Sequence, residues 1–85
     1  MPATLRKNRH HRLMTYTPIR RHATAADFTR WEALAETMSD AALWYAARDC
    51  RKVEAIWRRV DPVVEGFYSD QASTYSMVLA RRRGR

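Results

Sequence analysis

Turn residues are scarce in this chain, which has only two glycines and three prolines among its 85 residues. A protein built from strands normally needs more of them, because tight turns between strands favour glycine and proline. Strict alternation of apolar and polar residues, the pattern of a half-buried strand, is also missing. The sequence therefore predicts an all-α protein of a size that forms one domain at most.

Cysteines and long apolar runs are nearly absent as well. The single cysteine, Cys50, excludes an intramolecular disulfide and fits a reducing compartment. The longest apolar run covers the seven residues 41–47, whereas a membrane span needs about 20, so we expect no membrane span. The basic N-terminus lacks the apolar stretch of a signal peptide. An organelle transit peptide stays open, because residues 1–26 contain no acid, although they contain no serine either.

Side chains that carry chemistry are few and scattered. The histidines are His10, His11 and His22. All of them precede the predicted helices, and no cysteine or carboxylate accompanies them at the spacing of metal ligands. Cys50 falls on a predicted core face, where a thiol behaves as a small apolar group. The two glycines form no phosphate-binding loop. We therefore expect no catalytic residue, no metal and no cofactor, and hence no enzyme.

Charge is distributed unevenly behind the net charge of +7. Residues 1–26 hold six basic and no acidic residues, residues 27–80 hold six basic and nine acidic residues, and residues 81–85 hold four arginines. A mildly acidic body thus carries a cationic arm at each end. Such arms bind nucleic acid or acidic surfaces, or serve as solubilising tails, and the sequence leaves these alternatives open. The candidate binding residues are Arg6, Lys7, Arg9, Arg12, Arg20, Arg21, Arg81, Arg82 and Arg83.

Two segments lead up to the main helices. Residues 1–23 contain RKNRHHR and TYTPIRRH, show no helical period and are interrupted by Pro18, so we expect a basic extended arm. A helix over about residues 24–38 follows, because Thr24-x-x-Asp27 is a start that resembles a capping box. Its apolar residues recur at helical spacing. They are Phe28, Trp31, Ala35 and Met38.

A helix over about residues 39–60 is the most clearly marked element. Ser39 can cap its N-terminus, and Asp40 suits the positive end of the helix dipole. Pro62, preceded by Asp61 as a cap, ends this helix and opens the next. The apolar residues share one broad face of the helix. They are Ala42, Leu43, Ala46, Cys50, Val53, Trp57 and Val60.

The last predicted helix covers about residues 62–82 and completes a helical domain of residues 24–82, followed by a basic tail of residues 83–85. Because the connection before it is short, the two long helices should form an antiparallel helical hairpin. Two helices make a thin core, so either the first helix packs across it or a partner completes it. The apolar face of this helix comprises Val64, Phe67, Tyr68, Ala72, Tyr75, Val78 and Leu79.

The hairpin determines which side chains should meet. The expected contacts join Cys50, Val53 and Trp57 of one helix to Phe67, Tyr68, Tyr75 and Leu79 of the other. Replacing Trp57 by alanine should therefore unfold the protein, because truncating a buried aromatic costs about 3–5 kcal/mol. Asp49 and Gln71 also fall within the apolar faces, and we expect them to form a structural polar core that fixes how the helices align.

Trp44 points away from the apolar face of its helix. Its neighbours on the helical wheel are Arg48 and Arg51, with Arg58 on the same flank. Tryptophan and arginine are enriched in interface hot spots, and arginine stacks on indole, so these residues are a candidate partner-binding surface. The alternative is that the first helix covers Trp44 as core. The last helix carries a row of small side chains. This row either lets another surface approach the helix backbone closely or is an ordinary solvated face. The row consists of Gly66, Ser69, Ser73, Ser76 and Ala80.

The stretches SDAALWYAARDC and GFYSDQASTYSMVLARRR are similar to a small family of tailed-phage proteins. In that family a DxALxYxxKDC-like helix precedes a GxYxDQxxxY-like helix and a basic end. The resemblance covers residues 39–83 and fails at Arg48, where lysine is expected, and in the long arm of residues 1–23. It implies a phage origin and agrees with two helices, but it implies no activity. The matching residues are Asp40, Leu43, Tyr45, Asp49, Cys50, Gly66, Tyr68, Asp70, Gln71 and Tyr75.

These features favour a non-enzymatic virion component, a minor structural, capsid or connector-associated helical protein whose cationic arms dock on a larger assembly. The main alternative is a phage-encoded inhibitor that binds one host defence or regulatory protein through the surface around Trp44. A second alternative is an accessory protein that binds nucleic acid through the arms without sequence preference. The expected location is the virion or the host cytoplasm, and a homo-oligomer stays open.

Overall fold

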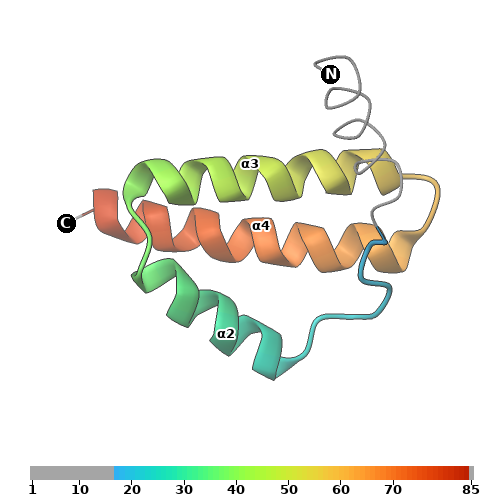
Figure 1. Ribbon diagram of the computed structural model, residues 1–85, viewed down its shortest axis with the longest axis horizontal. Helices are drawn as coiled ribbons and strands as arrows, with labels where there is room; N and C mark the ends of the chain where they lie inside the picture. Colours follow the sequence, from blue (N-terminus) through green and yellow to red (C-terminus); the bar gives the residue numbers. More distant parts are fainter. Residues whose placement is uncertain (1–16, 85) are drawn as a thin grey trace, which may run out of the picture.

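Three helices account for most of the described chain. The computed structural model describes residues 17–84, which form α2 (Ala25–Glu36), α3 (Asp40–Trp57) and α4 (Pro62–Arg83) and contain no strand (Figure 1). The prediction of an all-α protein is confirmed over these residues.

Side-chain caps explain where each helix begins. The Thr24 hydroxyl accepts a hydrogen bond from the Asp27 backbone N–H, and the Asp27 carboxylate accepts one from the Thr24 N–H, which completes a capping box. The Ser39 hydroxyl accepts from a backbone N–H in the first turn of α3 at 3.1 Å. Asp61 accepts from two N–H groups of α4, and Pro62 takes the first helical position, where an N–H would have no partner inside the helix.

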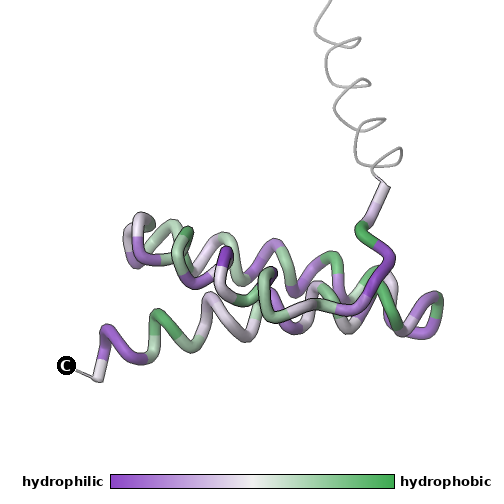
Figure 2. The backbone as a smooth tube through the Cα atoms, turned by 90° about the horizontal axis from the view of Figure 1, so that it is seen from below, coloured by the Kyte–Doolittle hydropathy of each residue, from purple (hydrophilic) through white to green (hydrophobic). Residues whose placement is uncertain are grey.

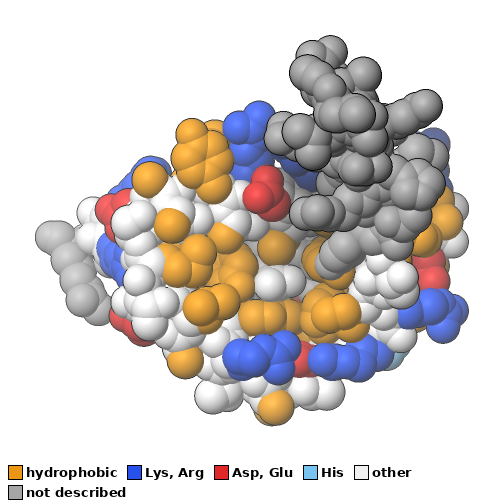
Figure 3. All heavy atoms as spheres, in the orientation of Figure 1, with side chains coloured by type: hydrophobic (Ala, Val, Ile, Leu, Met, Phe, Trp, Pro, Cys, Tyr) orange, Lys and Arg blue, Asp and Glu red, His pale blue; other side chains and the backbone are white. Residues whose placement is uncertain are grey.

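The central element is α4, because α2 and α3 both pack against it. Helices α3 and α4 lie side by side and run in opposite directions, while α2 crosses α4 at an angle (Figure 1). Hydrophilic and hydrophobic segments alternate along the helices (Figure 2), as expected for helices that bury one face. Apolar side chains gather between α2 and α3 on the face drawn in Figure 3.

A run of four aromatic rings joins α2 to α4. Trp31 is only 3% exposed and lies edge-on to Phe28 of its own helix and to Phe67 of α4, with ring centroids 5.3 and 5.2 Å apart. Phe67 in turn lies edge-on to Tyr68 at 5.3 Å. Each such pair adds about 0.5–1.5 kcal/mol beyond the burial of its rings. The buried apolar core comprises Trp31, Ala35, Leu43, Ala47, Cys50, Val64, Phe67, Tyr68, Ala72, Tyr75, Val78 and Leu79.

Residues 17–23 are anchored on the helices, although the sequence predicts them as part of an extended arm. The backbone N–H of Ile19 donates to the Tyr68 hydroxyl at 3.2 Å. The Arg20 guanidinium pairs with Asp61 at 2.6 Å, at the start of α4. The described part of the predicted arm, residues 17–23, is therefore non-helical and lies against the helices. The rest of that arm and the last residue of the predicted tail lie outside the described residues.

Helix α3 ends at Trp57 rather than at residue 60. Arg58 has φ −58° and ψ 129°, Arg59 has φ 72°, and the Val60 N–H donates to the Trp57 carbonyl at 2.9 Å. These values describe a type II turn, in which the third residue must adopt a positive φ. Val60 is consequently 65% exposed instead of lying on the buried face.

The contacts of α3 and α4 also depart from the predicted set. Cys50 and Leu79 are buried, as expected. Phe67 also packs edge-on against Trp31 of α2, a contact outside the predicted set, and Trp57 is only half-buried beside the core. The most deeply buried tryptophan is thus Trp31 of the short helix α2. The helical wheels of the two long helices do not indicate that Phe67 packs against it.

This difference in burial predicts an order of stability among three tryptophan variants. Trp31→Ala should cost about 3–5 kcal/mol, comparable to the whole stability of a small domain, whereas Trp57→Ala should cost about 1–3 kcal/mol and Trp44→Ala about 0.5 kcal/mol or less. Thermal unfolding followed by circular dichroism measures all three. Equal losses from Trp44→Ala and Trp31→Ala would contradict the assignment of Trp31 as the core residue.

Candidate functional site

An open groove of about 590 Å³ runs between α3 and α4. Within residues 17–84, its lining residues belong to these two helices and include three arginines but no carboxylate. The lining residues are Trp44, Ala47, Arg48, Arg51, Ser76, Leu79, Ala80 and Arg83. We call this site the α3–α4 groove.

The floor of the α3–α4 groove is apolar and built from small side chains. Ala47 and Leu79 are buried, and Ser76 and Ala80 face the opening from α4. Because short side chains project little from the helix, another backbone can approach α4 closely here. The row of small residues on α4 therefore coincides in part with a hollow in the surface.

Trp44 forms an exposed wall of the groove. Its side chain is 48% exposed, and the Arg48 guanidinium lies 5.4 Å from its ring centroid. Tyr45 stands edge-on to the indole at 5.0 Å. The alternative that the first helix buries Trp44 is wrong, because α2 packs on α4 and contributes Trp31 as the buried indole.

Arg51 is held in place across the seam between the helices. Its guanidinium donates to Glu54 at 2.8 Å on its own helix, and to Ser73 at 3.2 Å and Ser69 at 3.5 Å on α4. These contacts fix the orientation of the guanidinium beside the groove. They also explain the polar small residues in this part of α4, because longer side chains would occupy the place of the Arg51 head group.

The other predicted partner-binding arginine, Arg58, does not line the groove. It lies toward the turn, 3.4 Å from Glu65 of α4 and 3.9 Å from Glu54. Three of the four predicted partner-binding residues, Trp44, Arg48 and Arg51, thus share one groove, and Arg58 belongs to a neighbouring cluster of ion pairs.

Arg83 joins the groove from a distant part of the sequence. The sequence predicts it as a residue of the basic arms, and the structure places it against the same hollow as Trp44. The small residues of α4 were the only sequence signal for this side of the site. Which helix they face depends on the register between α3 and α4, and a single-helix wheel contains no information on that register.

The remaining predicted arm residues divide into three groups. Arg81 is exposed, whereas Arg20, Arg21 and Arg82 make specific contacts within the fold. Four of them, Arg6, Lys7, Arg9 and Arg12, lie outside the described residues.

Arg82 closes the junction between α2 and α3. Its guanidinium donates to the backbone carbonyls of Ala35 at 2.9 Å and Met38 at 2.8 Å, and it pairs with Asp40 at 3.1 Å. The Ala35 carbonyl also accepts from the Met38 backbone N–H at 3.0 Å, so Arg82 adds a donor from α4 to the end of α2 and another to the segment that follows it. The prediction of a free cationic arm is wrong for this residue.

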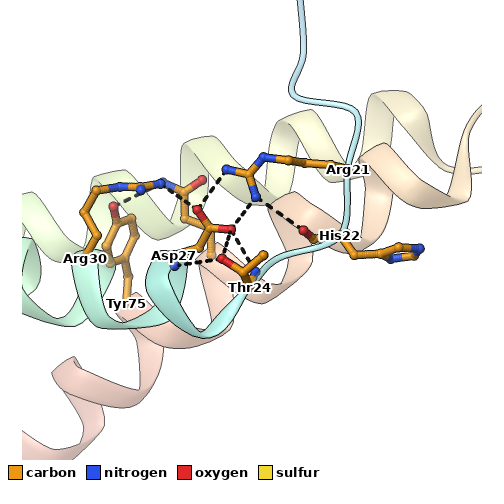
Figure 4. Close-up of polar contacts among 7 residues, drawn as sticks. Arg21, His22, Thr24, Asp27, Arg30 and Tyr75 are labelled. Carbon is orange, nitrogen blue, oxygen red and sulfur yellow. Dashed lines mark hydrogen bonds and ion pairs between the residues drawn. The ribbon is translucent and has the colours of Figure 1, made fainter.

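Arg21 is part of an ionic cluster around the buried carboxylate of Asp27 (Figure 4). Asp27 is 1% exposed, and its carboxylate accepts hydrogen bonds from Arg21 and from Arg30, each with a contact of 2.9 Å. The Arg21 guanidinium also lies 5.2 Å from the ring centroid of Phe67. The pKa of Asp27 lies far below its ordinary value, first because Arg21 donates to the carboxylate and next because the Thr24 backbone N–H does. Arg21 therefore holds the segment before α2 onto the core.

The predicted structural polar core of Asp49 and Gln71 is wrong for Asp49, which is exposed. An ionised carboxylate is costly to bury without a partner, and the core-facing stripe of α3 is narrower than the wheel suggests, because only α4 packs extensively on this helix. Gln71 is half-buried, and its amide nitrogen donates to the Tyr75 hydroxyl at 3.1 Å.

Cys50 lies on the buried face of α3. Burial raises the pKa of its thiol to about 11, and the neighbouring charge of Asp49 adds to the rise. Within residues 17–84 no cluster of three or more His, Cys, Asp or Glu side chains could hold a metal ion. Over the same residues, no helix combines the length and the hydropathy that crossing a membrane requires.

Comparison of the chain with protein-family models, with curated proteins and with solved structures finds no match.

The ion pairs of the buried Asp27 carboxylate predict an acid-sensitive fold. Because the folded-state pKa is lowered, ionised Asp27 adds stability that is fully present above the ordinary pKa of 3.8 and is lost as the pH falls below it. The urea midpoint of the wild type should therefore drop more between about pH 6 and about pH 3 than that of Asp27→Asn. The control is Asp70→Asn, which changes an exposed carboxylate and should keep the wild-type drop. Equal drops in Asp27→Asn and the wild type would contradict the role of Asp27.

The raised pKa of Cys50 predicts an unreactive thiol. A rise from 9.0 to about 11 lowers the thiolate fraction near pH 8 roughly 100-fold, and burial slows the reaction further. A chromogenic disulfide reagent should therefore label the native protein at least about 100-fold more slowly than the urea-unfolded protein. Cys50→Ser should give no signal in either state, and comparable rates in the two states would show that Cys50 is accessible.

Proposed function

We propose that the protein is a non-enzymatic interaction protein that docks on a larger protein assembly through the α3–α4 groove. The resemblance of residues 39–83 to tailed-phage proteins makes a virion the assembly that we favour. The observation that carries the proposal is the half-exposed Trp44 beside three arginines in a hollow with an apolar floor.

The groove has the composition of an interface centre. Tryptophan and arginine dominate interface hot spots, and these lie in pockets that a partner can desolvate. Arg48 is already stacked on Trp44, and Arg51 is held by side chains of both helices. Because these side chains are ordered before binding, less conformational entropy is lost when a partner arrives.

A second candidate function is inhibition of one host defence or regulatory protein through the same groove. It is favoured by the concentration of the exposed indole and two neighbouring arginines, Arg48 and Arg51, in one site, since a small inhibitor needs one strong contact region rather than many. The two candidates differ in the partner and share the binding residues.

Nucleic-acid binding through the arms receives less support. Arg20, Arg21 and Arg82 are engaged with Asp61, Asp27 and backbone carbonyls, so they are not free to follow a phosphate chain.

Mass spectrometry of purified virions tests the proposal. The wild-type protein should be present at fixed stoichiometry, and Trp44→Ala and Arg48→Glu should each reduce its incorporation roughly tenfold or more. The matched control is Ile56→Ala, which changes a residue of α3 that is 68% exposed and does not line the groove. Circular dichroism confirms that every variant is folded.

Absence of the protein from virions would overturn the virion assignment. In that case, affinity purification from infected cells decides on the second candidate, which requires one host protein at stoichiometric yield with wild type and Ile56→Ala but not with Trp44→Ala. Incorporation of Trp44→Ala and Arg48→Glu at the wild-type level, together with unchanged recovery of a host protein, would overturn docking through the groove altogether.

A further inference from the structure

The register between α3 and α4 orders the side chains along the α3–α4 groove. The Arg51 guanidinium donates to Ser73 at 3.2 Å and to Ser69, one turn nearer the start of α4, at 3.5 Å, so Arg51 lies near the level of these residues in the antiparallel pair. One turn further along, toward the start of α3 and the end of α4, Arg48 falls opposite Ser76. The first half of the groove therefore presents two arginines, whose Cα atoms lie about 4.5 Å apart along the axis at 1.5 Å per residue.

The second half of the groove is apolar and ends in a further cation. Another turn brings Trp44 to the level of Ala80, and Arg83 follows at the far end. The distance along α4 from the level of Ser73 to Arg83 is about 15 Å at 1.5 Å per residue. Over about three helical turns, the groove is therefore lined in order by two arginines, an apolar stretch and a third arginine.

We infer that the α3–α4 groove binds an acidic amphipathic helix of another protein, about three turns long, with carboxylates at i, i+3 and i+10 and an apolar side chain at i+7. The inference rests on the proposed function, because it names the chemistry of the partner of that same groove. The carboxylates face Arg51, Arg48 and Arg83, and the apolar side chain lies over Ala80, beside the indole of Trp44.

Charge complementarity requires an acidic occupant. Arg48, Arg51 and Arg83 line the groove without any lining carboxylate, and the one acid that bonds to Arg51 is Glu54, on the side toward the turn. An occupant without negative charge would leave Arg48 and Arg83 facing it unpaired, which disfavours binding.

The spacing of the groove favours a helix as the occupant. The α4 positions Ser73, Ser76, Ala80 and Arg83 follow the i, i+3, i+7, i+10 spacing of one helix face, and a helix that lies along such a seam repeats this spacing. The short side chains of Ser76 and Ala80 allow the close helix–helix distance that this packing needs.

A single-stranded nucleic acid fits the groove less well. Bases bind such sites by stacking on an aromatic face, and the Trp44 ring already has the Arg48 guanidinium 5.4 Å from its centroid and Tyr45 edge-on beside it. The apolar floor of Ala47 and Leu79 offers nothing to a phosphate.

A labelled synthetic helix tests the inference by fluorescence anisotropy with the full-length protein. The probe is an alanine-rich peptide of about 14 residues, held helical by a side-chain lactam, with glutamate at i, i+3 and i+10 and leucine at i+7. The matched control peptide has the same composition, with the glutamates moved to the opposite face of the helix. The probe should bind at least about tenfold more tightly than the control.

Protein variants assign the binding to the groove. Trp44→Ala should weaken binding of the probe roughly 30-fold, as expected for a hot-spot residue, and Arg48→Glu about tenfold or more. Ile56→Ala should bind like the wild type. Raising the salt concentration should weaken binding of the probe, because the three cations lie at the exposed rim.

Three results would overturn the inference. The first is equal affinity for the probe and the control peptide, or no binding of either. The second is tighter binding of an oligothymidylate that Arg48→Glu abolishes, which would assign the groove to nucleic acid. The third is a dimer in multi-angle light scattering that Arg48→Glu dissociates, which would assign the groove to a second copy of the chain. Each leaves the proposed function standing if virion incorporation still depends on Trp44.

Discussion

The edge-on contact between Trp31 and Phe67 determines which surfaces of the protein are free. It fixes α2 on the flank of α4 and thereby supplies the third element that the thin pair of long helices requires. The ionic cluster around Asp27 and the stacking of Arg21 on Phe67 reinforce the same contact from the segment before α2. Because the core is completed on this flank, no other helix of residues 17–84 packs extensively on the opposite flank of α3 and α4, and Trp44 remains exposed there.

The two tryptophans therefore have opposite roles although both lie on amphipathic helices. Trp31 is surrounded by aromatic rings and contributes to stability, whereas Trp44 carries an arginine on its face and borders the α3–α4 groove. The arginines divide in the same way. Arg21 and Arg82 form contacts that hold the three helices together. Arg48 and Arg83 instead line the α3–α4 groove at the surface.

Local signals in the sequence predict where the helices begin, but they do not predict which side chains of different helices contact one another. The caps at Thr24, Ser39 and Asp61 act through neighbouring backbone groups, so their spacing alone predicts where the helices begin. The burial of Asp49, by contrast, depends on how wide a stripe of α3 is covered by α4, and the role of Arg82 depends on carbonyls 44 and 47 residues away. Such long-range relations leave no periodic pattern, so Arg83 could not be assigned to the groove.

The turn between α3 and α4 has a consequence for the integrity of the chain. Arg58 and Arg59 are adjacent, exposed and outside the helices, and the positive φ of Arg59 keeps this peptide from joining either of them. Proteases that cleave after arginine need a substrate backbone that is accessible and not helical, and beyond Arg21 the other arginines of the described chain lie within helices. A cleavage after Arg58 or Arg59 would fall between the two long helices, and the core that these helices share would hold the two fragments together.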